Sequence, residues 1–285
     1  MFKFLNRIVQ SKSEKENLSP EKEPAVKTKY HTGLVLSGGG ARGISHLGSV
    51  KALLEYGYTF DVIAGTSIGA IVGCILADGY HPDQILSMLT GSRLKSFVKT
   101  DFSRNGLMTL EGIREFLSEI LKSEKIEDLP LPFIVAATNL NKGEIHYFRE
   151  GNLLNAVIAS ASVPIVFPPV TINGELYVDG GLINNLPVRP IRSECDFIIG
   201  IHVNPSGLGL RGGQAKGLIQ IAERTFHVSM LGNVLTDKKM CDLFIQHEEL
   251  SPYTLFNFSK AKDIFTIGYE KTKELLTLLK SNTAN

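Results

Sequence analysis

The sequence predicts an α/β fold in which helices cover both faces of a mainly parallel sheet. A short apolar strand at residues 31–36 is followed by a glycine-rich loop and a helical pattern that ends near Gly57. A second apolar strand starts at Phe60, and a tight turn and a buried helix follow it. Continuous apolar runs at 131–137 and 197–203 suit further strands. Strands that alternate with helices predict parallel pairing through right-handed crossovers.

The other elements are predicted from periodicity and from turn residues. Helices are expected at 82–89, 109–121, 152–160, 218–235 and 269–280, and strands at 144–148, 170–172, 176–178 and 242–246. Asn173-Gly174 is a hairpin turn between two of these strands. Five glycines between residues 204 and 217 predict a mobile loop. One domain over residues 30–285 accounts for these elements, and residues 1–29, rich in Lys, Glu, Ser and Pro, are expected to form a disordered charged leader.

Composition narrows the classes of function. The formal net charge of +1 gives no electrostatic case for a nucleic-acid partner. Three cysteines without C-x-x-C spacing predict neither a disulfide framework nor a zinc site, so no metal or cofactor is expected and a cytoplasmic location fits best. Residues 1–9 carry positive charge but lack the apolar core of a signal peptide. They are either a frayed terminus or an amphipathic patch in peripheral contact with the inner membrane surface. No feature predicts an oligomeric state.

The segment Gly65-Thr66-Ser67-Ile68-Gly69 has the pattern of a nucleophile elbow. A serine at a sharp turn between a strand and a helix adopts strained backbone angles, and flanking glycines let the helix pack close to the strand. The Ser67 hydroxyl would then stand at the start of a helix, whose dipole favours the negative charge that develops during acyl transfer. A glycine-rich turn with an idle serine is the simpler alternative. A G-x-x-x-G membrane helix is excluded, because the apolar run is too short to span a bilayer.

The glycine loop after the first strand has two interpretations. It satisfies G-x-G-x-x-G between a strand and a helix, as in dinucleotide-binding folds, but the acidic residue required at the carboxyl end of the second strand is missing, since Asp61 precedes that strand. Alternatively, the backbone N–H groups of the loop face Ser67 as an oxyanion hole. The candidate residues of this hole are Gly38, Gly39, Gly40, Arg42 and Gly43. The Arg42 side chain could also neutralise a lipid phosphate, but capping of neighbouring carbonyls or pairing with a surface acid is favoured.

A serine nucleophile needs a base, and the sequence offers two kinds. A Ser, Asp, His order would use a histidine after the acid, with His202 best placed and His227 and His247 further along the chain. Alternatively, Asp179 is itself the base, and its structural alternative is a turn aspartate that bonds its own backbone. The glycines that permit the bends at the serine and at this aspartate are Gly65, Gly69, Gly180 and Gly181.

Four blocks of the sequence together resemble the patatin-like phospholipase family in order and spacing. They are Ser-Gly-Gly-Gly-Ala-Arg-Gly at 37–43, Gly-Thr-Ser-Ile-Gly-Ala at 65–70, Ala-Ser-Ala-Ser-Val-Pro with Phe-Pro-Pro at 159–169, and Asp-Gly-Gly at 179–181. The resemblance is strong over about residues 30–203 and loose beyond them, and the chain is similar to the short, single-domain bacterial members. It implies a three-layer α/β/α fold and a Ser–Asp dyad, with Ser67 as nucleophile, Asp179 as base and the glycine loop as oxyanion donor.

The resemblance also implies hydrolysis of a fatty acyl ester of a lipid, of the phospholipase A, lysophospholipase or esterase type, through an acyl-enzyme. We therefore expect the acyl chain to lie along apolar residues of the 86–121 helices and of the 163–167 segment. Two alternatives remain: a non-catalytic or weakly catalytic lipid-binding regulatory protein on the same fold and, less favoured, a dinucleotide-binding protein. Head group, acyl length and positional preference are not predicted.

Overall fold

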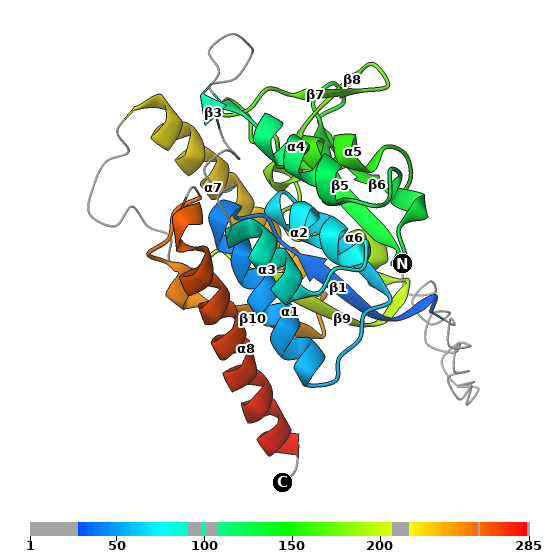
Figure 1. Ribbon diagram of the computed structural model, residues 1–285, viewed down its shortest axis with the longest axis vertical. Coiled ribbons are helices and arrows are strands. Elements are labelled where there is room, and N and C mark those ends of the chain that lie inside the picture. Colours follow the sequence, from blue (N-terminus) through cyan, green and yellow to red (C-terminus); the bar gives the residue numbers. More distant parts are fainter. Residues whose placement is uncertain (1–27, 91–98, 101–107, 207–216, 256, 284–285) are drawn as a thin grey trace, which may run out of the picture.

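The computed structural model of the protein describes residues 28–90, 99–100, 108–206, 217–255 and 257–283 (Figure 1). Of the leader expected over residues 1–29, only Thr28 and Lys29 are therefore described. The Thr28 hydroxyl donates to Asp196, and the Lys29 ammonium lies 4.8 Å from the centre of the Tyr30 ring. Residues 207–216 of the predicted glycine-rich loop also lie outside the described residues. Within the described part of the chain, no helix is long and apolar enough to cross a membrane.

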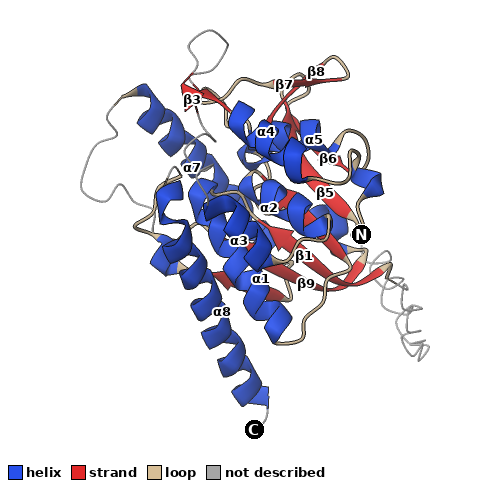
Figure 2. Ribbon diagram, in the orientation of Figure 1, coloured by secondary structure: helices blue, strands red, loops and turns tan. Residues whose placement is uncertain are grey.

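An eight-stranded sheet forms the centre of the fold (Figure 2). Its strands are β1 (Tyr30–Leu36), β2 (Val62–Thr66), β5 (Phe133–Asn139), β6 (Glu144–Phe148), β7 (Val170–Ile172), β8 (Glu175–Asp179), β9 (Cys195–His202) and β10 (Leu243–Gln246). The order is β10-β9-β1-β2-β5-β8-β7, and β6 also pairs with β5. The strands from β10 to β5 are parallel, whereas β6, β7 and β8 pair antiparallel. The predicted mainly parallel sheet is therefore confirmed.

Helices cover both faces of this sheet. They are α1 (Ser45–Glu55), α2 (Ile68–Ala77), α3 (Pro82–Thr90), α4 (Glu111–Ile120), α5 (Leu153–Ala161), α6 (Arg189–Arg192), α7 (Leu218–Lys238) and α8 (Ala261–Thr283). Alternate side chains of β1 enter two separate apolar cores: Leu34 joins the larger core with α1, α2 and α8, and Val35 joins the smaller core with Ile191 of α6 and Val234 of α7. Figure 1 shows α1, α3 and α8 side by side on one face. The three-layer arrangement is thereby confirmed.

Helix α8 begins at Ala261, well before its predicted start. Gly268 lies inside it, and a Cβ at this position would come within 2.2 Å of Ser45 O in α1. A Cβ at Gly48 of α1 would likewise come within 2.1 Å of Phe265 O. The two glycines let α1 and α8 pack backbone against backbone, and this contact offsets the low helix propensity of glycine. Here a glycine marks a contact between helices and not the end of one.

Short elements account for the other differences from the predicted pattern. Helix α4 starts at Glu111 and not at Thr109, whose Oγ1 accepts the Glu111 N–H at 3.1 Å. Thr109 instead ends β4 (Met108–Thr109), which pairs with β3 (Lys99–Thr100) in a separate two-stranded sheet. These strands and the four-residue helix α6 were not predicted, because such short elements show no periodicity and no hairpin turn like Asn173-Gly174 was recognised beside them.

Candidate active site

Ser67 lies between the carboxyl end of β2 and the start of α2, where the elbow pattern predicts it. Its φ of 57° and ψ of −125° are rare for a residue that carries a side chain. The turn is tight because two glycines leave room for it: a Cβ at Gly65 would come within 2.4 Å of Gly69 O, and one at Gly69 within 2.3 Å of Leu36 O. Backbone strain of this kind concentrates at functional sites.

Helix α5 holds this turn in place. The Ser67 N–H donates to Ser160 Oγ at 2.8 Å, and Ser160 Oγ donates to Ala136 O of β5 at 2.6 Å. Just beyond the end of α5, Ser162 O accepts the Asp179 N–H at 2.9 Å. The same segment therefore contacts both the serine turn and the aspartate turn. The Ala-Ser-Ala-Ser block contributes to the family resemblance, but its sequence alone did not predict these contacts.

The strand register brings Asp179 close to Ser67. Thr66 of β2 pairs with Ala136 of β5, and Asp179 of β8 pairs with Ala137, the next residue along β5. The aspartate therefore lies in the row of residues that continues from Ser67 across β5. A Cβ at Gly180 would come within 2.3 Å of Ala136 O, so the turn after Asp179 fits closely against β5 only because it has no side chain there.

The Asp179 carboxyl is fully buried. Burial raises its pKa to about 7, while the nearby Ser67 hydroxyl and the Gly181 N–H favour the ionised form. Its Oδ1 accepts the Gly181 N–H at 2.8 Å, whereas its Oδ2 has no regular hydrogen-bond partner among the described residues. One oxygen is thus fixed in the turn and the other is free to hold a proton. A carboxyl whose pKa lies near neutrality is suited to accepting and returning a proton.

The glycine loop lies directly beside Ser67. A Cβ at Gly38 would come within 3.0 Å of Ser67 Cβ. The Gly38 N–H donates to Asn185 O at 3.2 Å, so it is already engaged, whereas the N–H groups of Gly39 and Gly40 have no acceptor among the described residues. Gly40 has a φ of 57°, which turns the chain into the short 3₁₀ helix η2 (Gly40–Ile44). Gly39 and Gly40 are therefore better candidates for oxyanion donors than Gly38.

The two residues that follow β9 hold the glycine loop in place. Asn204 Nδ2 donates to Gly38 O at 2.8 Å, and Ser37 Oγ accepts the Val203 N–H at 3.1 Å. A Cβ at Gly39 would come within 2.4 Å of Val203 Cγ2, so the loop and the strand are in contact. The predicted mobile loop included Asn204, but its side chain is buried and bonded to the glycine loop.

Arg42 and Gly43 stabilise the glycine loop without lining the pocket. The Arg42 side chain is fully buried, and its Nε donates to Gly39 O at 3.4 Å. This is the favoured carbonyl-capping role, and it keeps the guanidinium away from any lipid phosphate at the surface. A Cβ at Gly43 would come within 2.3 Å of Ile68 Cγ2, so this glycine lets the loop pack on α2. Neither residue is among those that line the pocket beside Ser67.

The histidines proposed as bases lie in other surroundings. His202 is buried, its ring centre lies 6.2 Å from that of Phe244, and no hydrogen bond joins it to Asp179. Burial lowers the pKa of His202 to about 3. His247 Nε2 lies 3.1 Å from Ser49 Oγ in a buried polar cluster with α1 and α8. The side chain of the third candidate, His227, is not among those that the structure describes. The two described histidines thus have packing partners that involve neither Ser67 nor Asp179.

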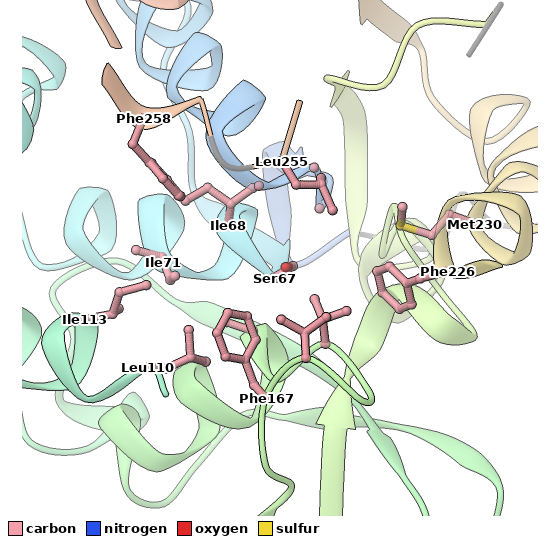
Figure 3. A pocket seen from close by; sticks show the side chains of 16 residues that line it. Ser67, Ile68, Ile71, Leu110, Ile113, Phe167, Phe226, Met230, Leu255 and Phe258 are labelled. Carbon is pink, nitrogen blue, oxygen red and sulfur yellow. The ribbon is translucent and has the colours of Figure 1, made fainter. Parts of the chain in front are cut away.

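A pocket of about 680 Å³, including its part open to solvent, lies beside Ser67 (Figure 3). Apart from the serine and the glycine loop, its walls are apolar and consist of Ile68, Ile71, Leu110, Ile113, Ala161, Val163, Val166, Phe167, Phe226, Met230, Leu255 and Phe258. The α4 region and the 163–167 segment line it as expected, but Leu86 does not. Figure 3 shows Ser67 as the polar side chain among its labelled residues. An apolar pocket that ends at a hydroxyl suits an acyl chain with its ester at the serine.

A scan against family models finds the patatin-like phospholipase model over residues 34–192. This range is more than half of the chain and contains the glycine loop, the Ser67 turn and the Asp179 turn. The chain belongs to the patatin-like phospholipase family. The resemblance noted in the four sequence blocks is therefore confirmed.

Relatives of this patatin-like chain occur in bacteria and fungi. An uncharacterized NTE family protein of Mycobacterium bovis is 35% identical over 179 residues, covering 62% of this chain and 50% of that protein. Lysophospholipase NTE1 of Meyerozyma guilliermondii is 29% identical over 279 residues, covering 88% of this chain and 19% of that protein. Lysophospholipase nte1 of Emericella nidulans is 31% identical, and the match covers 87% of this chain and 18% of that protein. The chain thus spans about half the length of the mycobacterial relative and under a fifth of the fungal ones.

Among solved structures, VipD from Legionella pneumophila has a TM-score of 0.52 at 17% identity, over 91% of this chain and 72% of that one. This likeness shows a shared fold.

The patatin-like site gives no support to the dinucleotide alternative, in which Asp61 would hold a ribose. Asp61 Oδ2 instead accepts the N–H groups of His31 and Thr32 at 3.0 and 2.8 Å. Both contacts lie at the amino end of β1, opposite the glycine loop. No group of three or more His, Cys, Asp or Glu residues among those described is arranged to hold a metal ion.

The pocket walls from α7 and from residues 255–258 were not predicted for this patatin-like site. Phe226 and Met230 of α7 line the pocket, and Leu255 and Phe258 close it from the segment before α8. The sequence signal was the apolar periodicity of the 218–235 helix. Periodicity identifies an amphipathic helix, but it does not say which distant segment the apolar face meets.

Proposed function

We propose that this patatin-like chain hydrolyses fatty acyl esters of lipids, with Ser67 as the nucleophile and Asp179 as its base. The observation that carries the proposal is the strained Ser67, placed in one row of the sheet with a buried carboxyl and at the wall of an apolar pocket. Two fungal relatives, both named lysophospholipases, support the lipid ester as substrate class.

The reaction would proceed through an acyl-enzyme. Ser67 Oγ attacks the ester carbonyl carbon while Asp179 takes the hydroxyl proton on Oδ2. The N–H groups of Gly39 and Gly40 stabilise the oxyanion, each donor lowering the barrier by about 3 kcal/mol. The intermediate then releases the alcohol, which leaves with the proton from Asp179. Water hydrolyses the acyl-Ser67 ester in a second step and frees the fatty acid.

Peripheral contact with a lipid surface is part of the same proposal. Ile165 is 55% exposed and has a φ of 72°, which is strained for a β-branched residue, and it lies between the pocket residues Val163 and Val166. Along α7, Ile221, Val228 and Leu235 are exposed at a spacing of seven residues, which puts them on one side of the helix. An exposed apolar side chain beside the pocket, Ile165, and an exposed apolar stripe on the opposite side of α7 from the pocket residues Phe226 and Met230 favour a substrate that comes from a bilayer or micelle.

Sedimentation with phospholipid vesicles tests this contact. We expect Ile165→Glu and Leu235→Glu to reduce vesicle binding, because each puts a charge where an apolar side chain would meet lipid. Leu278→Glu is the matched control, since Leu278 is also exposed but lies on α8. If Ile165→Glu and Leu235→Glu bind vesicles as well as the control Leu278→Glu does, the case for contact through this surface is removed.

Covalent labelling tests the proposed chemistry. Wild type, Ser67→Ala, Asp179→Asn and His202→Ala would be treated with a fluorophosphonate probe, and hydrolysis of a p-nitrophenyl acyl ester and of a lysophospholipid would be followed. We expect wild type and His202→Ala to label and turn over, while folded Ser67→Ala and Asp179→Asn do neither. A wild type that is inert in every assay would favour the regulatory alternative. A His202→Ala loss as large as that of Ser67→Ala would replace the dyad by a triad.

A further inference from the structure

The side chain of Asn185 is the most unusual polar group near the candidate site. It is fully buried, and neither its Oδ1 nor its Nδ2 has a hydrogen-bond partner among the described residues. Buried side-chain amides are almost always hydrogen-bonded, because leaving them unpaired opposes folding. A group that is kept unpaired in the folded state therefore calls for a partner that binds during function.

The Asn185 amide lies between the nucleophile and the base. A Cβ at Gly38 would come within 2.6 Å of Asn185 Oδ1 and 3.0 Å of Ser67 Cβ. A Cβ at Gly181 would come within 2.9 Å of Asn185 Oδ1 and 3.1 Å of Asp179 Oδ1. The amide oxygen thus faces space that exists only because both neighbours are glycine. Asp179 Oδ2, which also lacks a partner among the described residues, belongs to the same carboxyl.

The backbone around Asn185 fixes this placement from two sides. Asn185 O accepts the Gly38 N–H at 3.2 Å, and its own N–H donates to Asn233 Oδ1 of α7 at 3.2 Å. Asn233 Nδ2 in turn donates to Gly181 O at 3.3 Å. The residue is therefore tied both to the glycine loop and, through Asn233, to the turn that carries the base. Such support is what a group needs if it is to act at a defined position.

We propose that Asn185 is a catalytic residue of deacylation, holding the water that hydrolyses the acyl-enzyme together with Asp179. The inference rests on the proposed function. A water has two hydrogens to donate, and Asn185 Oδ1 and Asp179 Oδ2 are two buried oxygens that lack partners among the described residues and can accept them. Held in this way, the water directs its lone pair at the acyl carbon on Ser67.

Deacylation moves one proton from the water to Asp179 and then to Ser67. The water oxygen bonds to the acyl carbon, and one of its protons passes to Asp179 Oδ2, while the other stays on the former water oxygen and donates a hydrogen bond to Asn185 Oδ1. The tetrahedral intermediate then breaks the bond between Ser67 Oγ and the acyl carbon, and Asp179 returns the proton to Ser67 Oγ. The fatty acid leaves. In acylation the proton comes from Ser67 itself, so that half-reaction has no use for the Asn185 amide.

Pre-steady-state kinetics with a p-nitrophenyl acyl ester separates the two half-reactions. For Asn185→Ala we expect release of the first p-nitrophenol at close to the wild-type rate, followed by turnover that is about tenfold to hundredfold slower. Intact-mass measurement should then show acyl-Ser67 accumulating. Asn185→Asp keeps an acceptor in place but adds a like charge beside Asp179, so it should deacylate faster than Asn185→Ala with a pH profile displaced to higher pH.

Asn184 supplies the matched control, because it is equally buried and its Oδ1 also lacks a partner among the described residues, whereas its Nδ2 donates to Asp237 of α7 at 3.1 Å. Asn184→Ala should lower the midpoint of thermal unfolding without acyl-enzyme accumulation. The inference is overturned if Asn185→Ala slows both half-reactions equally, slows neither, or behaves like Asn184→Ala. Should Asn185→Ala fail to fold, the pH profile of Asn185→Asp decides. A wild type that never forms acyl-Ser67 overturns the proposed function as well, and this result differs from all the others.

Discussion

The Ser160 hydroxyl accepts the backbone N–H of Ser67 at 2.8 Å. This contact engages the N–H of the candidate nucleophile, so that N–H is not available to a developing oxyanion. Stabilisation of the oxyanion then falls to the glycine loop, where the N–H groups of Gly39 and Gly40 have no acceptor among the described residues. The strained turn and the oxyanion donors are thus provided by different segments of the chain.

Replacement of Ser160 should disturb the serine turn specifically. Ser160→Ala leaves the buried Ser67 N–H without a partner, at a cost of about 1–3 kcal/mol in folding free energy. We expect a lower unfolding midpoint and slower labelling of Ser67 by a fluorophosphonate. Ser162→Ala is the control, because its hydroxyl bonds only Ile158 O of its own helix and its contact with Asp179 uses the backbone carbonyl. Labelling of both variants at the wild-type rate would show that the Ser160 contact does not support the turn.

The glycine loop should tolerate no side chain at Gly39. A Cβ there would come within 2.4 Å of Val203 Cγ2, so Gly39→Ala displaces the loop and its N–H groups from the oxyanion. We expect kcat to fall by about a hundredfold or more with KM little changed. Gly232→Ala is the control, since a Cβ at this α7 position meets nothing within 4 Å, and alanine should stabilise the helix by about 0.5–1 kcal/mol. A Gly39→Ala enzyme with wild-type kcat would exclude this loop as the oxyanion hole.

The pH dependence of activity should follow the buried carboxyl of Asp179. Only the ionised form can accept the serine proton, and burial raises its pKa to about 7 from the ordinary 3.8. We therefore expect kcat/KM on an uncharged ester to rise with pH and to reach half of its maximum near pH 7. Activity that is already maximal at about pH 5 would contradict this assignment of the base.

The same carboxyl should make the fold less stable as pH rises. Because the folded-state pKa of Asp179 is higher than its unfolded value, the folded state keeps a proton that the unfolded chain has lost between pH 3.8 and about 7. The stability contributed by the protonated form is complete below pH 3.8 and is lost as pH rises through this window. Asp179→Asn should therefore raise the free energy of unfolding at pH 8, by an amount on the order of a few kcal/mol, and with it the unfolding midpoint, while changing both little at pH 3. A midpoint difference that does not depend on pH would show that this pKa is not raised.

The sequence signals the Ser67 turn and the Asp179 turn because both impose local rules. A strained serine needs Gly65 and Gly69 to make room, and a carboxyl in a sharp turn needs Gly180 and Gly181, so the chemistry leaves its pattern within a few residues. The parallel order of β1, β2 and β5 follows from their alternation with helices. The antiparallel pairing of β8 with β5, which the sequence pattern did not predict, brings the Asp179 turn beside the Ser67 turn. The roles of the serine and the aspartate stay predictions, which the experiments above address.

Contacts between distant segments leave no such local pattern. Asn204 follows β9 in a stretch whose glycines predicted a mobile loop, yet its amide holds the Gly38 carbonyl. Phe226 and Met230 look like the apolar stripe of any helix, and only the packing of α7 shows that they face Ser67. The last helix was predicted to start only after Gly268, whereas this glycine lies inside α8 and lets it pack against the backbone of α1. In each case the decisive partner lies far away in the sequence.

The length of the acyl chain that fits should depend on Ile71. This residue lines the pocket beside Ser67 and also a second apolar space of about 420 Å³, including its part open to solvent, which reaches Ile75, Leu89 and Phe116. Ile71→Trp would fill the junction between the two spaces, so the distal part of a long chain would lose its burial. Each methylene left in water costs about 0.8 kcal/mol, and loss of a few should reduce kcat/KM for a lauroyl ester by about a hundredfold.

A butyryl ester does not reach the junction, and its hydrolysis by Ile71→Trp should stay close to that of wild type. The measurement is therefore the ratio of kcat/KM for lauroyl and butyryl esters. Leu278→Trp is the control for the added indole, because Leu278 is 62% exposed on α8, away from the pocket, and the substitution should leave the ratio unchanged. If Ile71→Trp lowers both rates equally, the second space takes no part in chain selection, since a general disturbance of the site affects all esters alike.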